Sequence, residues 1–468
     1  MKKTWLLVLA VAVLLCLPLT AQAKTEFELG GYVKMETIWD TTQVNKNLLQ
    51  FISRTNDPNF NHGRLKFTAE NTRMNFTIKG PEIWGGKVTG FIEWDFDNHA
   101  NEYIFQGAPG GGWASPHKAR LGLRHAMFKI NWTDTEVMLG QYWSLLTEEV
   151  PETANFGAVT TAGQPFLREP QIRVSQSFDL GGGKLTASLA LSEATNGLWG
   201  LAINGTQTAN NNPYTGESSE APKITGRFKY DIDLWGKAAF WGRPRPFSVR
   251  AGGAYWRERF RGFAAPAAAN GQVFGQDNFK NVFVSQVTQQ YMDHWMVEGS
   301  AFIPVIPTNT ANLAGTASIL TQWFVGAGLD GFFEDFPAIA SYLQPMSGNG
   351  LTQATAFQAT RSLMKRYGGY VQAQYYFTNQ IFMNLVYGMN RAFGVNQNMW
   401  IGDTNANDPV KSNQQAYATV WYQPIKALKF GLEYTYVRTD YFQKRTVGTQ
   451  ISDYGQNHRL MACGFFFF

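Results

Sequence analysis

Cysteine is nearly absent from this chain of 468 residues, which has only Cys16 and Cys463. Cys16 lies in an N-terminal leader that we expect to be removed, so one thiol remains. A single thiol excludes an intramolecular disulfide and any cysteine-rich zinc or haem-attachment site. The six histidines also lack the His-x-x-x-His spacing of a metal site. We therefore expect no metal and no cofactor.

Charged residues are scarce, and long apolar runs are absent after the leader. Only 16% of the residues are charged, while aromatic residues make up 15% and there are 46 glycines. No stretch of about 18 apolar residues follows the leader, so the sequence predicts no transmembrane helix. A transmembrane β-barrel explains the mixture, because aromatic girdles lie at both interfaces and each strand is apolar on one face only. A secreted soluble β-sandwich or β-helix is the alternative.

The N-terminal segment has the pattern of a secretory signal peptide. Lys2 and Lys3 precede an apolar run from Trp5 to about Leu19, and Ala21-Gln22-Ala23 supplies the small residues of a cleavage site. We expect a signal peptide at 1–23 and one outer-membrane β-barrel domain at 24–468. The expected location is the bacterial outer membrane.

Alternating apolar and polar residues predict an all-β, transmembrane antiparallel barrel of about sixteen strands. The predicted strands lie near 26–36, 64–79, 87–96, 120–130, 136–143, 171–178, 184–192, 223–230, 246–256, 291–303, 317–328, 368–377, 380–390, 414–423, 428–438 and 457–468. The parity changes within 64–79, which predicts a bulge near 70–72. Short turns alternate with long polar loops, as in outer-membrane barrels, and an even count places both termini in the periplasm. Unusually long turns near 231–245 and 304–316 leave the count open by two strands.

Several patches between residues 64 and 178 resemble the DcaP-like branch of trimeric outer-membrane porins. The patches are Thr72-Arg73-Met74-Asn75-Phe76, Gly90-Phe91-Ile92-Glu93-Trp94-Asp95-Phe96, Arg120-Leu121-Gly122-Leu123-Arg124-His125-Ala126, Leu139-Gly140-Gln141-Tyr142-Trp143-Ser144 and Pro151-Glu152-Thr153-Ala154-Asn155-Phe156-Gly157 through Arg168 and Arg173. The second half resembles the family only in its strand rhythm and terminal Phe. The resemblance implies a homotrimeric, sixteen-stranded channel whose third extracellular loop folds inward and narrows the pore.

The last strand, 457–468, ends the chain on four phenylalanines. Its parity places Phe466 and Phe468 on the lipid face and Arg459 on the lumen face. The terminal Phe resembles the signal that the bacterial barrel-assembly machinery reads, so we expect that machinery as a partner during biogenesis, together with outer-membrane lipid. Phe465 and Phe467 have the opposite parity, and we expect them to pack under a periplasmic turn.

The loop between the fifth and sixth strands contains three acidic residues, Glu148, Glu149 and Glu152. In a porin such carboxylates face basic residues across a constriction, and the resulting field selects solutes by charge. We predict that the opposing wall is formed by Arg120, Arg124, Arg168 and Arg173. The alternative is that the acids cap a surface loop and the arginines pair with neighbouring carboxylates.

Basic residues outnumber acidic residues at the predicted inward positions. The predicted basic wall of the lumen includes Arg64, Lys66, Arg73, Arg227, Arg250 and Arg459. Rings of Arg and Lys are typical of anion and phosphate pores, because guanidinium groups bind carboxylates and phosphates in bidentate fashion. The sequence therefore predicts a porin for small hydrophilic solutes that favours anions such as organic acids or phosphate.

Two other functions fit a barrel of this kind. One is a scaffold barrel that works with periplasmic or extracellular partner proteins, and it would not conduct ions as a purified chain. The other is an outer-membrane hydrolase, which needs a nucleophile beside a histidine, and Ser144 with His125 is the pair to consider. We expect no enzyme activity. Nucleic-acid binding has no support either, because the basic residues are dispersed rather than clustered with aromatic residues.

Overall fold

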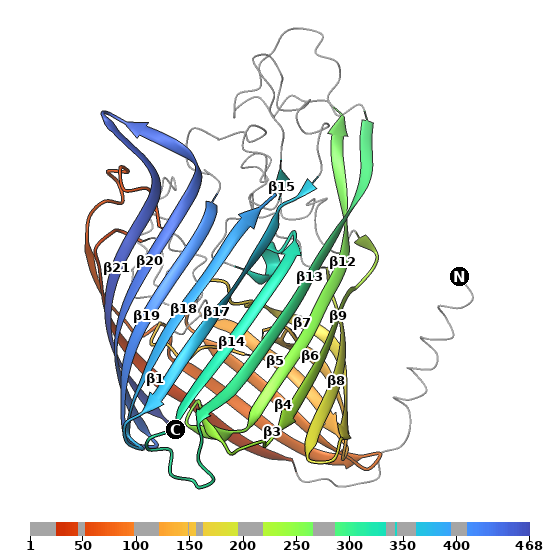
Figure 1. Cartoon of the computed structure of the whole chain (residues 1–468). Coiled ribbons are helices and arrows are strands. Elements are labelled where there is room, and N and C mark those ends of the chain that lie inside the picture. Colours follow the sequence, from red (N-terminus) through yellow and green to blue (C-terminus); the bar gives the residue numbers. More distant parts are fainter. Residues whose placement is uncertain are drawn as a thin grey trace.

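The structure, a computed structural model, is an antiparallel β-barrel closed between its first and last strands (Figure 1). It describes residues 25–44, 52–97, 121–147, 149–155, 162–194, 219–264, 286–333, 342–343, 362–394 and 410–468. Closure pairs both edges of the sheet, which is what a lipid environment requires of backbone N–H and C=O groups. Within these residues, no helix is long and apolar enough to cross a membrane.

Sixteen strands form the barrel wall. They are β1 (Glu26–Asp40), β2 (Arg64–Thr68) with β3 (Arg73–Ile83), β4 (Gly86–Asp95), β5 (Gly122–Asn131), β6 (Thr135–Trp143), β7 (Arg168–Asp179), β8 (Gly183–Ser192), β9 (Lys223–Ile232), β12 (Phe247–Ala264), β13 (Gln286–Ile306), β14 (Ala317–Ala327), β17 (Lys365–Tyr376), β18 (Ile381–Phe393), β19 (Val410–Ile425), β20 (Leu428–Val447) and β21 (Gln450–Phe467). The sheet has 17 hydrogen-bonded segments, but β2 and β3 both pair with β1 and are two halves of one strand, so 17 − 1 gives 16. The predicted fold and strand count are confirmed, and the parity change predicted near 70–72 falls at the break between β2 and β3.

Within the described residues, five short elements lie outside the wall. They are β10 (Ala238–Phe240), β11 (Arg243–Arg245), β15 (Tyr342–Leu343), β16 (Ser362–Leu363) and a 3-10 helix, η5 (Asp330–Phe332). The hairpin of β10 and β11 occupies the long turn near 231–245 that left the predicted strand count open. It adds no strand to the barrel wall.

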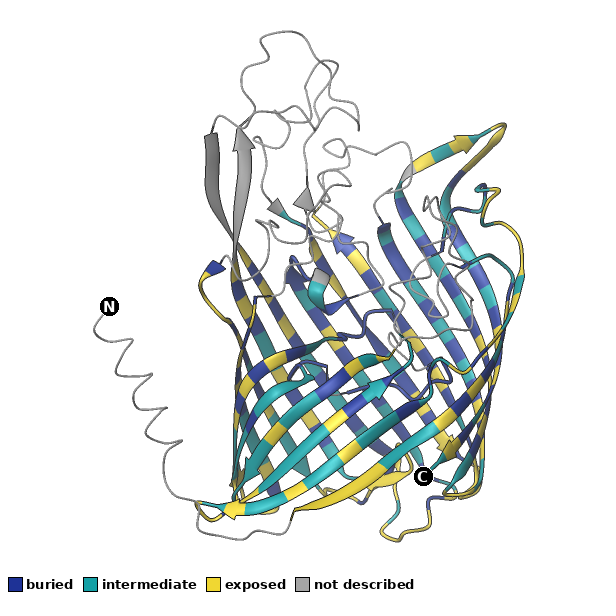
Figure 2. Ribbon diagram, turned by 180° about the vertical axis from the view of Figure 1, so that it is seen from behind, coloured by how far each residue is buried: buried dark blue, intermediate teal, exposed yellow. Residues whose placement is uncertain are grey.

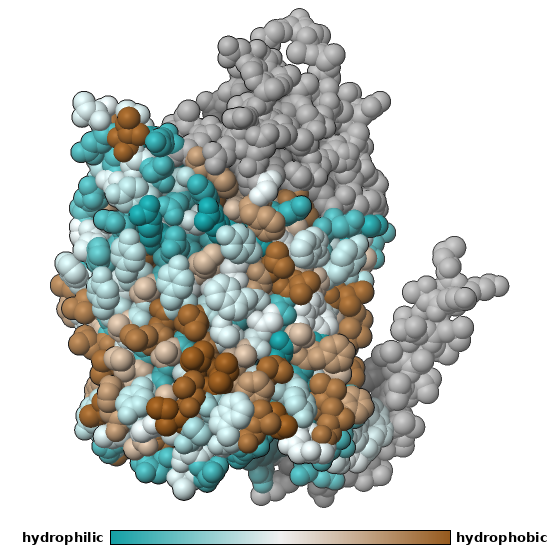
Figure 3. All heavy atoms as spheres, in the orientation of Figure 1, coloured by the Kyte–Doolittle hydropathy of each residue, from teal (hydrophilic) through white to brown (hydrophobic). Residues whose placement is uncertain are grey.

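Side chains alternate between lipid and lumen along the strands (Figure 2). On β1, Phe27 and Leu29 are exposed on the outside, whereas Lys34 and Asp40 are completely buried inside. On the face seen in Figure 3, hydrophobic residues gather over the lower part of the barrel, with more hydrophilic residues above them. The barrel with this apolar band is that of a bacterial outer-membrane protein. We call the rim with the short turns the periplasmic rim, because short turns lie there in such barrels.

The last strand closes the barrel against β1. Phe466 and Phe468 face outward and are about half exposed, at 51% and 45%. Phe465 instead lies inside the barrel, with its ring centroid 5.3 Å from that of Tyr32 and 5.6 Å from that of Phe467. The ring of Phe467 stacks on that of Phe465, and the backbone N–H of Phe467 donates to the carbonyl of Ala427, in the turn between β19 and β20, at 2.8 Å.

Candidate functional site

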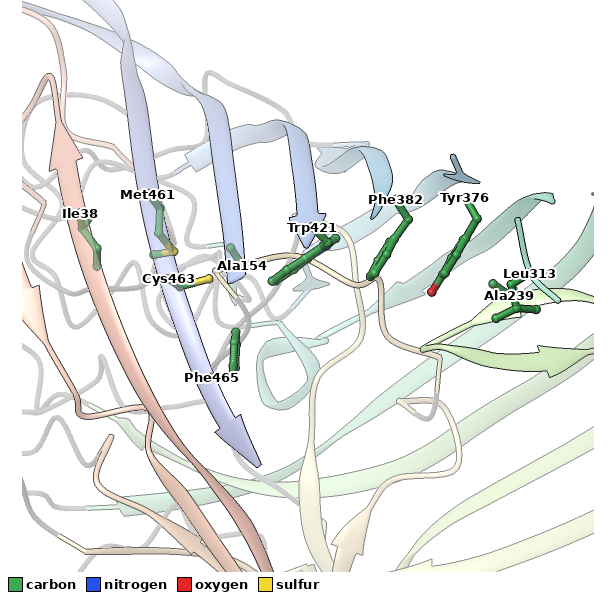
Figure 4. Packing of buried hydrophobic residues seen from close by; sticks show 10 residues of the cluster. All are labelled: Ile38, Ala154, Ala239, Leu313, Tyr376, Phe382, Trp421, Met461, Cys463 and Phe465. Atoms are coloured by element: carbon green, nitrogen blue, oxygen red, sulfur yellow. The ribbon is translucent and has the colours of Figure 1, made fainter. Parts of the chain in front are cut away.

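The third external loop, residues 144–167, folds into the barrel. Its described residues, 144–147, 149–155 and 162–167, are almost all buried. Figure 4 shows Ala154 of this loop inside the barrel, beside Trp421 of β19 and Cys463 of β21. The loop thus starts beside β6 and reaches the far wall of the barrel. A buried loop needs a partner for each backbone polar group that it removes from water.

Polar side chains of the wall supply those partners. The loop N–H groups of Glu152, Ala154 and Ala162 donate to Gln372, Glu433 and Gln415 at 2.6, 2.6 and 2.8 Å. The loop carbonyls accept from five wall residues, namely Arg227 at Leu145 (3.0 Å), Gln322 at Leu146 (2.8 Å), Tyr370 at Glu149 (2.9 Å), Asn384 at Glu152 (2.5 Å) and Lys34 at Ala154 (2.8 Å). Each bond to a buried group avoids the cost of leaving it unsatisfied, about 1–3 kcal/mol. The loop is therefore fixed in place by the wall.

Two glycines allow the loop to approach the wall closely. Gly163 of the loop has φ +79°, and a Cβ there would lie 2.0 Å from the carbonyl oxygen of Met389 and 2.6 Å from that of Gly369. On β12, a Cβ at Gly252 would lie 2.9 Å from the side chain of Leu146. Any larger residue at these positions would push the loop and the wall apart.

Glu149 of the third loop pairs with two arginines. Arg245 of β11 donates to its two carboxylate oxygens at 2.7 and 2.8 Å, and Arg250 of β12 lies 3.8 Å away. Burial raises the pKa of the Glu149 carboxyl, but the charge of Arg250 and the hydrogen bonds and charge of Arg245 outweigh it and lower the pKa to about 2. Glu149 therefore stays ionised at any physiological pH.

Glu152, three residues further on, is bound to the opposite wall. Its carboxylate accepts hydrogen bonds from Lys429 of β20 and, at 2.8 Å, from Gln374 of β17. The Lys429 ammonium also lies 4.0 Å from the ring centroid of Trp421, which is a cation–π distance. The two acidic residues of the loop therefore contact different parts of the barrel.

The β10–β11 hairpin enters the barrel from the periplasmic rim and meets the third loop. Ala238 and Ala239 at its base are buried, and the Ser318 hydroxyl donates to the Ala239 carbonyl at 3.1 Å. At its tip, the indole N–H of Trp241 donates to the carbonyl of Val150 in the loop at 3.0 Å. Together with the pair between Arg245 and Glu149, this contact joins elements that come from opposite rims.

The arginines of the predicted opposing wall have partners near the base of the third loop. Arg124 binds Glu93 and Asp95 at 2.8 and 2.5 Å, and Arg173 donates to the carbonyl of Trp143 at 3.2 Å. The guanidinium carbon of Arg168 lies 5.2 Å from the Trp143 ring centroid. These arginines surround the base of the third loop, whereas Glu149 and Glu152 are bound by residues of β11, β12, β17 and β20. Arg120 and Glu148 lie outside the described residues.

The six predicted basic wall residues all lie inside the barrel and have partners there. Arg64 binds Asp40, Lys66 binds Glu70 and Arg73 lies 3.7 Å from Glu93. The other three contact the third loop: Arg227 at Leu145, Arg250 at Glu149, and Arg459 at Asn155 at 3.0 Å. Much of the basic excess predicted from parity is therefore used for structure.

Inward residues near the periplasmic turns of β5, β6 and β9 are accessible to water. Lys129 and Glu136, an inward pair on β5 and β6, are 32% and 30% exposed, and Lys229 and Asp231 on β9 are 28% and 27% exposed. By contrast, the inward residues under the loop on β17–β20, such as Tyr370 and Glu433, are fully buried. Closer to the loop, inward residues of the same wall such as Met138, Arg173 and Arg227 are buried, so the water-accessible part of this wall lies toward the periplasmic rim.

The hairpin and the amide side chains that hold the loop were not predicted from the sequence. The run Ala238-Ala239-Phe240 in a supposed periplasmic turn was a usable signal, because three apolar residues there need a surface to pack on. Gln372, Gln374 and Asn384 share the inward parity of β17 and β18, but nothing in the sequence says that they bind a loop. Among the described residues, no group of three or more His, Cys, Asp or Glu could hold a metal ion.

Comparisons with known proteins give structural matches only. No family model and no curated protein matches the sequence. The outer-membrane channel DcaP of Acinetobacter baumannii matches with 16% identity over 95% of this chain and 97% of that chain, at a TM-score of 0.59. An anion-selective porin from Comamonas acidovorans matches with 10% identity over 95% and 100% of the two chains, at a TM-score of 0.50. At such low sequence identities, the similarity is one of fold. It confirms that this chain resembles the DcaP channel in its fold.

Proposed function

We propose that this protein is an outer-membrane porin through which small hydrophilic solutes diffuse, and that it is not an enzyme. One observation carries the proposal: an inward loop is anchored to the wall, and on its periplasmic side the inward ion pairs of β5, β6 and β9 remain accessible to water. A loop anchored through its backbone narrows a barrel without closing it, and a polar, hydrated lumen is what diffusing solutes need.

The narrowest part of the channel, in this proposal, lies where the third loop meets the β10–β11 hairpin. Glu149 and Glu152 contribute their carboxylates there, and Arg245, Arg250 and Lys429 contribute cations. Arg124, Arg168 and Arg173 line the approach at the base of the loop, and Arg120 and Glu148 belong to the same proposed constriction from outside the described residues.

A preference for anions such as organic acids or phosphate is the second part of the proposal. Its support is the exposed Arg243 at the hairpin tip. A solved structure with the same fold is described as an anion-selective porin. Cations that remain hydrated and unpaired along the path attract anions, whereas tightly paired charges nearly cancel at a distance.

Bilayer recording of the purified full-length chain tests both parts. We expect stable open channels in potassium chloride and, under a salt gradient, a reversal potential of the sign given by chloride selectivity. A reversal potential of the opposite sign would contradict anion preference, and absence of conductance would favour the scaffold barrel. A lipid and peptide hydrolysis assay with Ser144→Ala as control tests the enzyme alternative. Ser144 is fully buried, and within the described residues its hydroxyl makes no hydrogen bond to His125.

We also propose that the porin is a homotrimer that matures by cleavage after Ala23. The wall of β3–β6 is low, with strands of 9 to 11 residues against 16 to 21 on β12, β13 and β19–β21. Strands this short extend little beyond the bilayer, and a wall of such strands suits contact with other subunits. Mass measurement in detergent tests the trimer, and N-terminal sequencing of the outer-membrane form tests cleavage before Lys24.

A further inference from the structure

We propose that the tip of the β10–β11 hairpin is a binding subsite for planar aromatic carboxylates. The ring of the solute would lie on the indole of Trp241, and its carboxylate would bind the guanidinium of Arg243. The inference rests on the proposed channel function, because a solute reaches the tip through the lumen. It goes further by assigning a solute class to residues on the periplasmic side of the third loop.

The tip is the exposed part of an otherwise buried hairpin. Trp241 is 37% exposed, and Gly242, Arg243 and Pro244 are exposed as well, whereas Ala238 and Ala239 are buried. The hairpin contacts the third loop, so this exposed surface lies inside the barrel rather than on its outer face. A large apolar ring in contact with water is costly unless something covers it, which makes the indole a natural surface for an apolar part of a solute.

The backbone conformation of Trp241 is unfavourable for its side chain. Trp241 has φ +50° and Gly242 has φ +70°, and the pairing of Phe240 with Arg243 makes this a two-residue turn. Such turns favour Asn-Gly, because both central residues need positive φ. Asn would make the same turn with less strain, so the turn itself does not explain an indole at this position.

A second Trp-Gly turn in the same chain has a different explanation. Trp84 has φ +53° and precedes Gly85 in the turn between β3 and β4. It is exposed at the end of a barrel hairpin, where Trp belongs to the aromatic belt at the membrane interface. Trp241 lies inside the barrel and contacts no lipid, so the belt does not account for it.

The indole is held in a fixed position before any solute binds. Its N–H donates to Val150 at 3.0 Å, and the Lys429 ammonium lies 5.8 Å from its ring centroid. A ring fixed by a hydrogen bond to the loop loses little entropy when a solute stacks on it. Because Val150 belongs to the third loop, the fixed ring also lies at the narrow part of the channel.

Arg243 provides the charge that the solute needs. It is exposed, and within the described part of the chain it takes part in no ion pair, whereas the neighbouring cations Arg245 and Lys429 are bound to Glu149 and Glu152. A guanidinium group binds a carboxylate through two parallel hydrogen bonds. Phosphate and aliphatic acids would use only Arg243, and only a planar aromatic anion would use both residues.

Current-blocking measurements with benzoate test the subsite, with cyclohexanecarboxylate and inorganic phosphate as matched anions without an aromatic face. We expect benzoate to block the wild-type channel at about tenfold lower concentration than cyclohexanecarboxylate, a factor equal to about 1.4 kcal/mol and within reach of one aromatic contact. Trp241→Asn, which suits the turn, should abolish this preference, so that benzoate and cyclohexanecarboxylate block at equal concentrations. Arg243→Gln should weaken the block by both carboxylates.

Equal block by benzoate and cyclohexanecarboxylate, or a preference that survives in Trp241→Asn, overturns the subsite. Calorimetric titration of the detergent-solubilised full chain with benzoate separates this failure from failure of the porin proposal. Trp241-dependent binding without conductance overturns the porin and keeps the subsite. Conductance without ring preference overturns the subsite and keeps the porin, and absence of both overturns both.

Discussion

The ion pair between Arg245 and Glu149 is where the hairpin and the third loop hold each other, so Arg245→Ala should release the loop. The pair has two N–O distances of 2.7 and 2.8 Å, and Glu149 is only 5% exposed. Removing one partner of a buried ion pair costs about 3–5 kcal/mol, because the other charge stays buried. Arg250, 3.8 Å from Glu149, offsets part of this cost.

We therefore expect Arg245→Ala to weaken the contact between the loop and the hairpin by about 2–3 kcal/mol. This loss multiplies the population of displaced-loop states by about 30 to 150. The barrel strands keep their hydrogen bonds, so the temperature at which the whole barrel unfolds should change little. The change should appear in single-channel recordings as frequent current fluctuations and excursions to higher conductance.

Arg257→Ala is the matched control. Arg257 pairs with Asp293 at 2.6 Å on the outer face, where both side chains are about half exposed, so the pair contributes at most about 1 kcal/mol. This variant should record like the wild type. If Arg245→Ala is equally quiet, the hairpin does not hold the loop and the reasoning is refuted. The double variant with Glu149→Gln provides the coupling energy between the two residues.

Three further results are expected. Gly163→Ala should displace the third loop and change the conductance, because the added Cβ would lie 2.0 Å from a wall carbonyl oxygen. The expected loss of stability is about 1–3 kcal/mol or more. The control is Gly181→Ala, in a turn with φ +65° and nothing within 4 Å of the added Cβ, which should cost only about 1 kcal/mol and leave the recordings unchanged. The ion pair at Glu149 stabilises the anchored loop fully above the ordinary carboxyl pKa of 4.5, and this stabilisation is lost as the pH falls through the lowered pKa of about 2. Current noise should therefore stay constant from neutral pH to about pH 4 and rise only below about pH 3. Noise that rises near pH 5 would contradict this. Deleting Phe468, with Phe466 left in place, should reduce the amount of protein in the outer membrane on cell fractionation but not refolding of the purified chain in detergent, and equal amounts in both would exclude an assembly signal at the terminus.

The barrel was predictable because each strand has two environments. Lipid outside and water or polar side chains inside enforce alternation at every strand, and this local rule even located the break between β2 and β3 from a change of parity. The partners of the third loop were not predictable in this way. Lys429 and Glu152 are 277 residues apart in sequence. The alternation along a strand does not indicate which wall residues an inward loop will contact.

The pairing inside the lumen changes how selectivity should be inferred from sequence. A count of inward charges treats Arg64, Arg124 and Lys429 as equal contributors to an anion-attracting field, yet each lies against a carboxylate. Paired opposite charges act as short dipoles whose field falls off quickly, while a hydrated, unpaired cation acts at the full Debye length of about 8 Å. The sign of the selectivity should therefore depend on the few cations in water, and Arg243 is placed to be one of them. Arg243→Gln should reduce anion preference more than Arg124→Ala, although Arg124 belongs to the larger cluster of charges. The opposite order would mean that the buried arginines determine the selectivity.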